Sequence, residues 1–157
     1  MLKGVHPLIS ADLLYVLASM GHGDELAIVD RNYPAVSRGR RLVRLDGADV
    51  IQAAEAILGL FPLDTFVDVP VLRMEVVGAP DELPAVQKEF LAACEASERR
   101  AITMGSLPRQ QFYLRAHDAF AVVATSEPRP YGCFLITKGV IFDGPGVGSV
   151  SEERPAF

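Results

Sequence analysis

A histidine between two glycines is the first feature of this sequence that could do chemistry. It lies in the segment Gly21-His22-Gly23-Asp24-Glu25. An imidazole both accepts and donates a proton near neutral pH, and the flanking glycines leave the ring unshielded and the backbone free to turn. Two interpretations are open. His22 could transfer protons to a bound substrate, or it could cap the carboxyl end of a preceding helix, where a cationic ring is favourable.

Two aspartates could accept hydrogen bonds from hydroxyl groups of a substrate. Asp30 directly follows the apolar run Leu26-Ala27-Ile28-Val29, and Asp64 follows Leu60-Phe61-Pro62. Ligands of open α/β sheets gather where strands end at the carboxyl side, so Asp30 is placed where it could bind two adjacent hydroxyl groups of a ligand. Aspartates also form turns and caps, and the sequence leaves that alternative open for both residues.

Arginine and tyrosine side chains supply further candidates. Arg109 and Tyr113 are four residues apart in a predicted helix and therefore share a face, whereas Arg115 points elsewhere. A guanidinium offers a fork of donors, and a phenol can stack on the ring of a ligand or hydrogen-bond to it. A solvated arginine and a packed tyrosine are the alternatives. Tyr131-Gly132, before a predicted strand, could likewise be a turn alone.

The two cysteines give no sign of metal binding. Cys94 and Cys133 lie far apart, neither belongs to a metal-ligand spacing, and the three histidines are scattered, so we expect no structural metal site. We expect Cys133, which lies in an apolar strand, in the core rather than as a nucleophile, because burial opposes the thiolate. With no recognisable export signal, two reduced thiols in the cytoplasm are the simpler interpretation.

Composition excludes several classes of function. The chain has 157 residues, which favours one domain, and its 15 basic and 20 acidic residues give a net charge of −5. A nucleic-acid-binding protein usually carries an excess of basic residues, which this chain does not have. The negative charge also disfavours docking on anionic membranes. No apolar run approaches the roughly 20 residues needed to span a bilayer. We therefore expect neither nucleic acid nor membrane as a partner.

The elements that position these residues alternate between helix and strand. Apolar periodicity predicts helices over residues 10–20, 49–60, 84–99 and 108–119, and strands over residues 26–29, 41–45, 69–77, 101–104, 120–125 and 133–137. This alternation predicts an α/β fold in which helices cover both faces of a sheet.

Three local details and one boundary complete the expected fold. Ser10 should cap the first helix and Gly21 should end it as a glycine cap. Strand 69–77 should be half-exposed, because Leu72 alternates with Arg73 along it. We expect a single domain over residues 1–143, followed by a loose tail over residues 144–157 that is rich in glycine, serine and charge.

A set of short motifs, in order over about residues 1–140, resembles the fucose mutarotase and ribose pyranase family. The motifs are Met1-Leu2-Lys3-Gly4-Val5, Pro7-Leu8-Ile9-Ser10, Leu13-Leu14, Met20-Gly21-His22-Gly23-Asp24-Glu25, Asp30, Phe61-Pro62-Leu63-Asp64, Phe112-Tyr113-Leu114-Arg115-Ala116, Ala119-Phe120-Ala121-Val122-Val123, Tyr131-Gly132 and Lys138-Gly139-Val140. The fucose branch looks nearer, because ribose pyranases tend to have a GHTD-like loop and alanine in place of Gly132.

The resemblance implies a fold, an assembly and roles for individual residues. It implies a mixed sheet between helical layers, the ribose pyranase-like fold, and ring-shaped homodecamers in which a neighbouring chain helps to complete each site. It implies that His22 is the catalytic proton donor. The substrate-binding residues that it implies are Asp30, Asp64, Arg109, Tyr113, Tyr131, Gly132 and Cys133.

The implied activity is that of an isomerase which interconverts the α and β anomers of L-fucose or a related monosaccharide. Ring opening and closure move no electrons and release no group, so we expect neither cofactor nor metal. Relatives have asparagine in place of Cys133, and a thiol donates and accepts hydrogen bonds poorly, so the preferred sugar is left open. The alternatives are D-ribose pyranase activity, a non-catalytic sugar-binding protein of the same fold, and a purely structural ring-forming protein.

Overall fold

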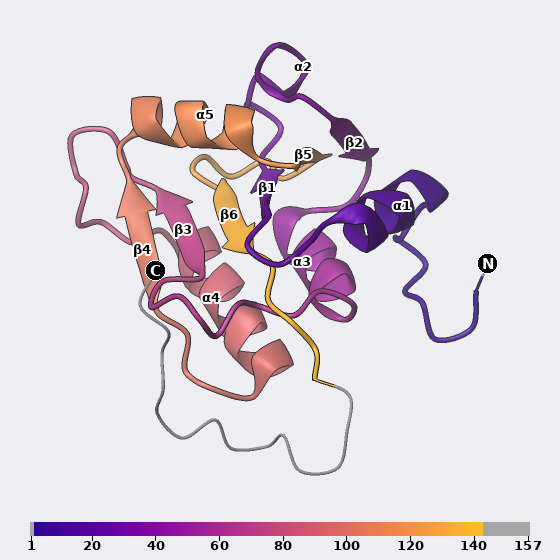
Figure 1. Ribbon diagram of the computed structural model, residues 1–157. Helices are drawn as coiled ribbons and strands as arrows, with labels where there is room; N and C mark the ends of the chain where they lie inside the picture. Colours follow the sequence, from indigo (N-terminus) through magenta and orange to yellow (C-terminus); the bar gives the residue numbers. More distant parts are fainter. Residues whose placement is uncertain (1, 143–157) are drawn as a thin grey trace.

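The helices and strands of the chain alternate in a computed structural model that describes residues 2–142 (Figure 1). The helices are α1 (Ala11–Ser19), α2 (Ala35–Arg38), α3 (Val50–Leu58), α4 (Ala85–Glu98) and α5 (Arg109–Asp118). The strands are β1 (Glu25–Val29), β2 (Leu42–Leu45), β3 (Val71–Met74), β4 (Met104–Leu107), β5 (Ala121–Thr125) and β6 (Phe134–Thr137). The expected tail over residues 144–157 lies outside the described residues, and the expected domain boundary stays a prediction.

The six strands form one mixed sheet in the order β2-β5-β1-β6-β3-β4. β1 is parallel to β5, β5 to β2, and β3 to β4, whereas β6 is antiparallel to both of its neighbours, β1 and β3. All strands except β6 therefore point the same way. Their ends meet at one edge of the sheet, the carboxyl edge, which carries Asp30, Glu75, Pro108, Ser126 and Cys133. The opposite amino edge carries Asp24, Pro70, Phe120 and Lys138.

Helices cover both faces of the sheet, as the sequence predicts. One hydrophobic cluster joins buried residues of α1, α3 and α4 to the sheet, and the other joins α2 and α5 to the opposite face. The central strand β1 divides its side chains between them: Leu26 and Ile28 lie in the first cluster, and Ala27 and Val29 in the second. Within residues 2–142, no helix is both long enough and apolar enough to cross a membrane.

The first helix begins as predicted but ends differently. Ser10 accepts a hydrogen bond from the backbone N–H of Leu13 and so caps α1. The predicted glycine cap at Gly21 is wrong, because α1 ends at Ser19 and Met20 already has extended backbone. The Lys138 ammonium, 2.8 Å from the Leu17 carbonyl oxygen and 2.6 Å from that of Met20, satisfies the end of the helix instead. Lys138 thus fills the capping role that the sequence left open for His22.

Two strand predictions need correction. The half-exposed strand over residues 69–77 is wrong: β3 covers four residues, and Arg73 is buried because α4 packs over that face. The strand predicted over residues 101–104 instead starts at Met104. Its signal is weak because it contains Gly105, where an added Cβ would lie 2.8 Å from the Val69 side chain. The short helix α2 has no apolar period long enough to be predicted.

Candidate functional site

His22 and Asp64 form a hydrogen-bonded pair at the amino edge of the sheet. The His22 Nε2 atom lies 3.1 Å from Asp64 Oδ1, and the same oxygen accepts the backbone N–H of Phe66 at 3.0 Å. The aspartate side chain is 2 % exposed and the histidine side chain 43 % exposed, so a buried carboxylate supports a ring that reaches solvent. Because a carboxylate only accepts, Nε2 carries the hydrogen in the neutral imidazole, and Nδ1 is left to take a proton.

The loop that carries His22 is tied at both ends. The backbone N–H of Gly21 donates to Asp24 Oδ2 at 2.7 Å, and the N–H of Gly23 donates to the carbonyl oxygen of Lys138 at 2.8 Å. Gly23 has a φ of +84°, in the left-handed region that favours glycine. The ring of Phe66 lies 5.2 Å from the imidazole. The glycines in this segment therefore shape a fixed turn that presents the histidine.

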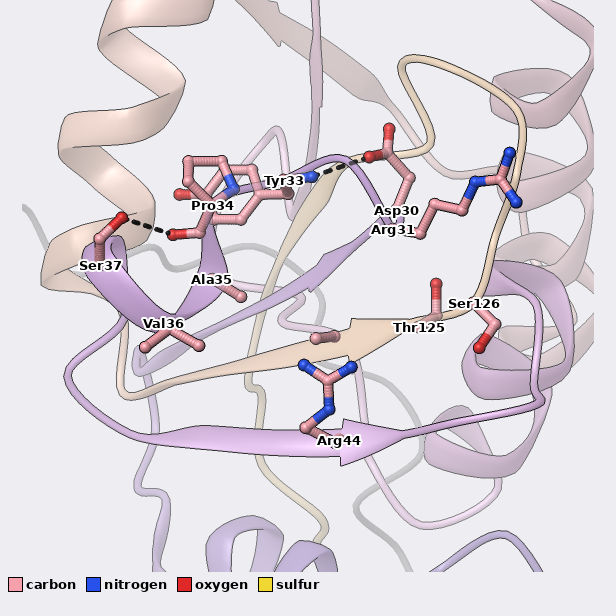
Figure 2. Close-up of a pocket in the computed structure, with 11 residues that line it drawn as sticks. Asp30, Arg31, Tyr33, Pro34, Ala35, Val36, Ser37, Arg44, Thr125 and Ser126 are labelled. Carbon is pink, nitrogen blue, oxygen red and sulfur yellow. Dashed lines mark hydrogen bonds between the residues drawn. The ribbon is translucent and has the colours of Figure 1, made fainter.

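Asp30 and Cys133 meet at the carboxyl edge. The Asp30 Oδ1 atom accepts the backbone N–H groups of Asn32 and Tyr33 at 2.9 and 3.1 Å, and Figure 2 shows the second of these bonds. The Cys133 thiol donates to Asp30 Oδ2 at 3.4 Å. Burial raises the pKa of Asp30, and the bonds from Asn32 and Cys133 oppose that shift only in part. Burial, and then the charge of Asp30, raise the pKa of Cys133 well above its usual value.

Tyr131 and Gly132 bring the start of β6 against Asp30. Tyr131 has a φ of +63°, which is uncommon for a residue with a side chain. Its phenol oxygen accepts the backbone N–H of Val77 at 3.2 Å, so the phenol hydrogen is free for another acceptor. A Cβ at Gly132 would lie 3.0 Å from the Glu127 side chain and 3.5 Å from that of Asp30. A side chain at this position would therefore require Glu127 to shift by a few tenths of an ångström.

The two predicted residues of α5 lie at and near the carboxyl edge. Arg109 is exposed at the first turn, two residues after β4 ends. One turn later, the ring of Tyr113 lies edge-on to the ring of Tyr33, with their centroids 5.2 Å apart, and the Arg38 guanidinium lies over it. Arg115 points away, as predicted, and forms a forked ion pair with Glu25.

Two hollows flank the sheet. A cavity of about 440 Å³ opens beside Asp30 at the ends of β1 and β5, and Arg31, Tyr33 and Thr125 also line it (Figure 2). A groove of about 1160 Å³ at the amino edge includes Asp64 among its lining residues. Among the described residues, no group of three or more His, Cys, Asp or Glu side chains could hold a metal ion.

The structure thus divides the predicted site residues into two groups. His22 and Asp64 lie at the amino edge, whereas Asp30, Arg109, Tyr131, Gly132 and Cys133 lie at the carboxyl edge, with Tyr113 one turn along α5. The five residues of β1 span about 13 Å at the usual rise of a strand, and the two groups lie beyond its opposite ends. Asp64 bonds to His22, and its expected role in holding a sugar stays a prediction. One chain does not gather all of these side chains around one ligand.

Comparison with known proteins assigns the family. The model of the RbsD / FucU transport protein family matches residues 3–141. The chain belongs to the RbsD/FucU family. The L-fucose mutarotase of Haemophilus influenzae (strain 86-028NP) is 42% identical over 140 residues, which cover 89% of this chain and 97% of that protein. The family resemblance predicted from the sequence motifs is confirmed.

Solved structures of the RbsD/FucU family share the fold. The fucose mutarotase of Streptococcus pneumoniae, in complex with L-fucose, has a TM-score of 0.84 and 38% identity, over 90% of this chain and 100% of that one. Bacillus subtilis RbsD, complexed with D-ribose, has a TM-score of 0.68 over the same shares of the two chains, and at 23% identity it shows a common fold alone. The predicted mixed sheet between helical layers is confirmed.

Three polar residues near the predicted site were not singled out from the sequence of this RbsD/FucU chain. Gln87 and Glu127 are fully buried, and the Tyr33 hydroxyl is buried with no hydrogen-bond partner among the described residues. The sequence does indicate that Gln87 is a buried polar residue, because it lies among the apolar positions Val86 and Phe90 of a predicted helix. Glu127 binds Arg129 at 2.8 Å and so fixes the loop that leads to Tyr131. That contact is visible only in the fold.

Proposed function

We propose that this chain is a cofactor-free mutarotase that interconverts the α and β anomers of L-fucose. The observation that carries the proposal is the His22–Asp64 pair, in which a buried carboxylate orients a solvent-accessible imidazole. Two relatives are matched over nearly their whole length. The Haemophilus influenzae protein is an L-fucose mutarotase, and the Streptococcus pneumoniae structure holds L-fucose. The ribose-binding relative is more distant, at 23% identity, which favours fucose over the ribose alternative.

Anomer exchange needs only proton transfer and bond rotation. The ring oxygen gains a proton while the anomeric hydroxyl loses one, the open aldehyde rotates about the bond to C1, and closure on the other face returns both protons. His22 Nδ1 takes up and delivers the proton, while Asp64 holds Nε2–H and stabilises the imidazolium that forms. Positioned acid–base catalysis of this kind contributes roughly a hundredfold to ten-thousandfold.

The carboxyl-edge group is proposed to hold the sugar. The carboxylate of Asp30 accepts from sugar hydroxyls, Arg109 donates through its guanidinium, and Tyr131 donates its free phenol hydrogen. Tyr113 offers a ring face or edge to the sugar. Gly132 and Cys133 shape the wall beside Asp30, where the thiol gives a weaker donor than the amide of an asparagine.

We further propose that each site forms between two copies of the chain, with the amino edge of one against the carboxyl edge of the next. His22 and Asp30 occupy opposite edges of one sheet, so a head-to-tail contact would bring the two groups together, and repeated contacts of this kind form a ring when the rotation between neighbours closes. Two apolar side chains near the amino edge are exposed, and such a contact would cover them: Phe66, against the His22 ring, at 44 %, and Leu114, in the groove that Asp64 lines, at 66 %. We propose a decamer. The cytoplasmic location expected from the sequence stays a prediction.

Magnetisation-transfer NMR between the anomers of L-fucose tests the activity. We expect the protein to accelerate exchange, His22→Ala to abolish the acceleration, and His117→Ala, an exposed histidine on α5, to leave it unchanged. Unchanged exchange with His22→Ala would overturn the proposed role of the imidazole. The same assay on D-ribose separates the pyranase alternative, and binding of L-fucose without accelerated exchange would favour a non-catalytic sugar-binding protein.

A further inference from the structure

The side-chain amide of Gln87 bridges two loops at the carboxyl edge. Gln87 lies on α4 and is fully buried. Its Nε2 donates to the carbonyl oxygen of Met74 at 2.8 Å, at the end of β3, and to that of Tyr131 at 3.0 Å, in the loop before β6. Its Oε1 accepts from the guanidinium of Arg73 at 3.2 Å. All the polar atoms of this amide therefore have partners.

Arg73 fixes which way the amide faces. A guanidinium only donates, so the oxygen of Gln87 must face Arg73 and the NH₂ group must face the two carbonyls. Arg73 is itself held, because its second terminal nitrogen donates to the carbonyl oxygen of Pro80 at 2.8 Å. Both side chains are buried, and a misplaced amide would leave polar groups unpaired away from water.

Tyr131 is the residue that needs such support. Its φ of +63° is a conformation that a residue with a side chain keeps only where its surroundings hold it. Two hydrogen bonds do so: Gln87 holds the carbonyl, and the backbone N–H of Val77 holds the phenol oxygen. Without the first bond, the loop can relax toward ordinary backbone angles, and the phenol would leave its place beside the backbone N–H of Val77.

We propose that Gln87, oriented by Arg73, is a positioning residue that sets the affinity for the sugar by fixing Tyr131. The proposal rests on the proposed function, in which Tyr131 donates to the sugar. Gln87 lies at the carboxyl edge, away from His22, so it acts on sugar binding and takes no part in the proton transfer. This separation gives the inference a distinct kinetic signature.

The kinetic test compares Gln87→Met with Lys88→Met, its exposed neighbour on the same helix. We expect Gln87→Met to raise the half-saturating concentration of L-fucose about tenfold, as for the loss of one ordering hydrogen bond, with the maximal exchange rate within about twofold. We expect Lys88→Met to behave as the wild type. In a Tyr131→Gly background, Gln87→Met should have no further effect, because it acts through Tyr131. An additive effect there, or a loss confined to the maximal rate, would overturn the proposal.

A readout independent of activity uses the four tyrosines. In protein labelled with 3-fluorotyrosine, the ¹⁹F resonance of Tyr131 is the one missing from Tyr131→Phe. We expect it to move in Gln87→Met and to stay in Lys88→Met; no movement in either overturns the positioning role. If the wild type does not accelerate fucose exchange, the proposed function fails while this measurement still decides the role of Gln87. Should Gln87→Met not fold, Arg73→Met/Gln87→Met, which leaves no unpaired guanidinium, carries the same tests.

Discussion

His22 and Asp30 lie at opposite ends of strand β1, on the two edges of one sheet. Each has its own buried partner at its own edge: His22 bonds to Asp64, and Asp30 accepts from Cys133. The group proposed to transfer protons and the group proposed to bind the sugar are therefore separate within one chain. The proposed enzyme needs both groups around one sugar, so its activity depends on how copies of the chain meet.

Replacing Asp64 by asparagine should slow anomer exchange while leaving sugar affinity nearly unchanged. The amide cannot stabilise the imidazolium, and its NH₂ group can favour the wrong tautomer, so we expect a fall of roughly tenfold to a thousandfold in the maximal rate. NMR exchange rates over a range of L-fucose concentrations measure both quantities. Asp12→Asn, on the exposed first turn of α1, is the control. A maximal rate equal to that of the wild type would show that Asp64 does not support His22.

The affinity for the sugar should weaken at low pH because of Asp30. Burial raises the pKa of Asp30 above 3.8, and only its ionised form accepts from two hydroxyls. Affinity should therefore be full above the raised pKa and fall as the pH drops through it, at a higher pH than for an ordinary aspartate. Calorimetric titration of L-fucose across this range measures the change. Asp30→Asn should bind weakly at every pH, and a persisting titration in that variant would assign it to another group.

Asp30 should also affect the pH dependence of stability. Between 3.8 and the raised pKa, the folded chain holds a proton that the unfolded chain has lost, so the contribution of Asp30 to stability falls as the pH rises through this window. The stability lost over this window should be smaller in Asp30→Asn. Urea denaturation at several acidic pH values measures it, and identical pH profiles for the two proteins would contradict the prediction.

Neither cysteine should react with a thiol reagent in the folded protein. Burial raises the pKa of Cys94 to about 12 and that of Cys133 well above its usual value, so almost no thiolate forms. The absorbance released from an aromatic disulfide reagent should stay near zero until denaturant is added and then account for both cysteines. Prompt reaction of one thiol under native conditions would show that its surroundings are more open than described.

Phe90→Ala should strongly destabilise the fold. The ring of Phe90 on α4 stacks on that of Phe134 on β6 with their centroids 3.7 Å apart, and both side chains are fully buried. Truncation to alanine should lower the free energy of unfolding by about 3–5 kcal/mol, and Phe90→Leu should lower it by less because it leaves a smaller cavity. Urea denaturation gives both values. Equal losses in the two variants would show that cavity size does not determine the loss.

Local patterns in the sequence located most of the fold. Apolar periodicity placed α1, α3, α4 and α5, and short apolar runs placed β1, β5 and β6 to within a few residues. The errors come from contacts between distant segments. Lys138, which caps the end of α1, lies 118 residues after Met20 in the sequence. Arg73 is buried by α4, whereas the strand pattern alone assigns it to solvent.

The candidate site was predicted residue by residue but not as an arrangement. The segment around His22 and the position of Asp30 after a strand carry local signals of chemistry. The sequence also contains the information that His22 and Asp30 lie apart, because the predicted strand between them is too long for both side chains to contact one small ligand. The support of His22 by Asp64 and of Tyr131 by Gln87 depends on residues that are 42 and 44 positions apart. Only the folded sheet brings such residues together.

Mixing two inactive variants tests most directly whether neighbouring copies share a site. His22→Ala and Asp30→Asn, expressed together with different tags and purified through both, should form mixed oligomers in which about a quarter of the head-to-tail contacts pair an intact His22 with an intact Asp30. We predict that these oligomers regain up to that fraction of wild-type fucose exchange, while each variant alone has none. Mixed oligomers as inactive as the separate variants would contradict a site built from two copies.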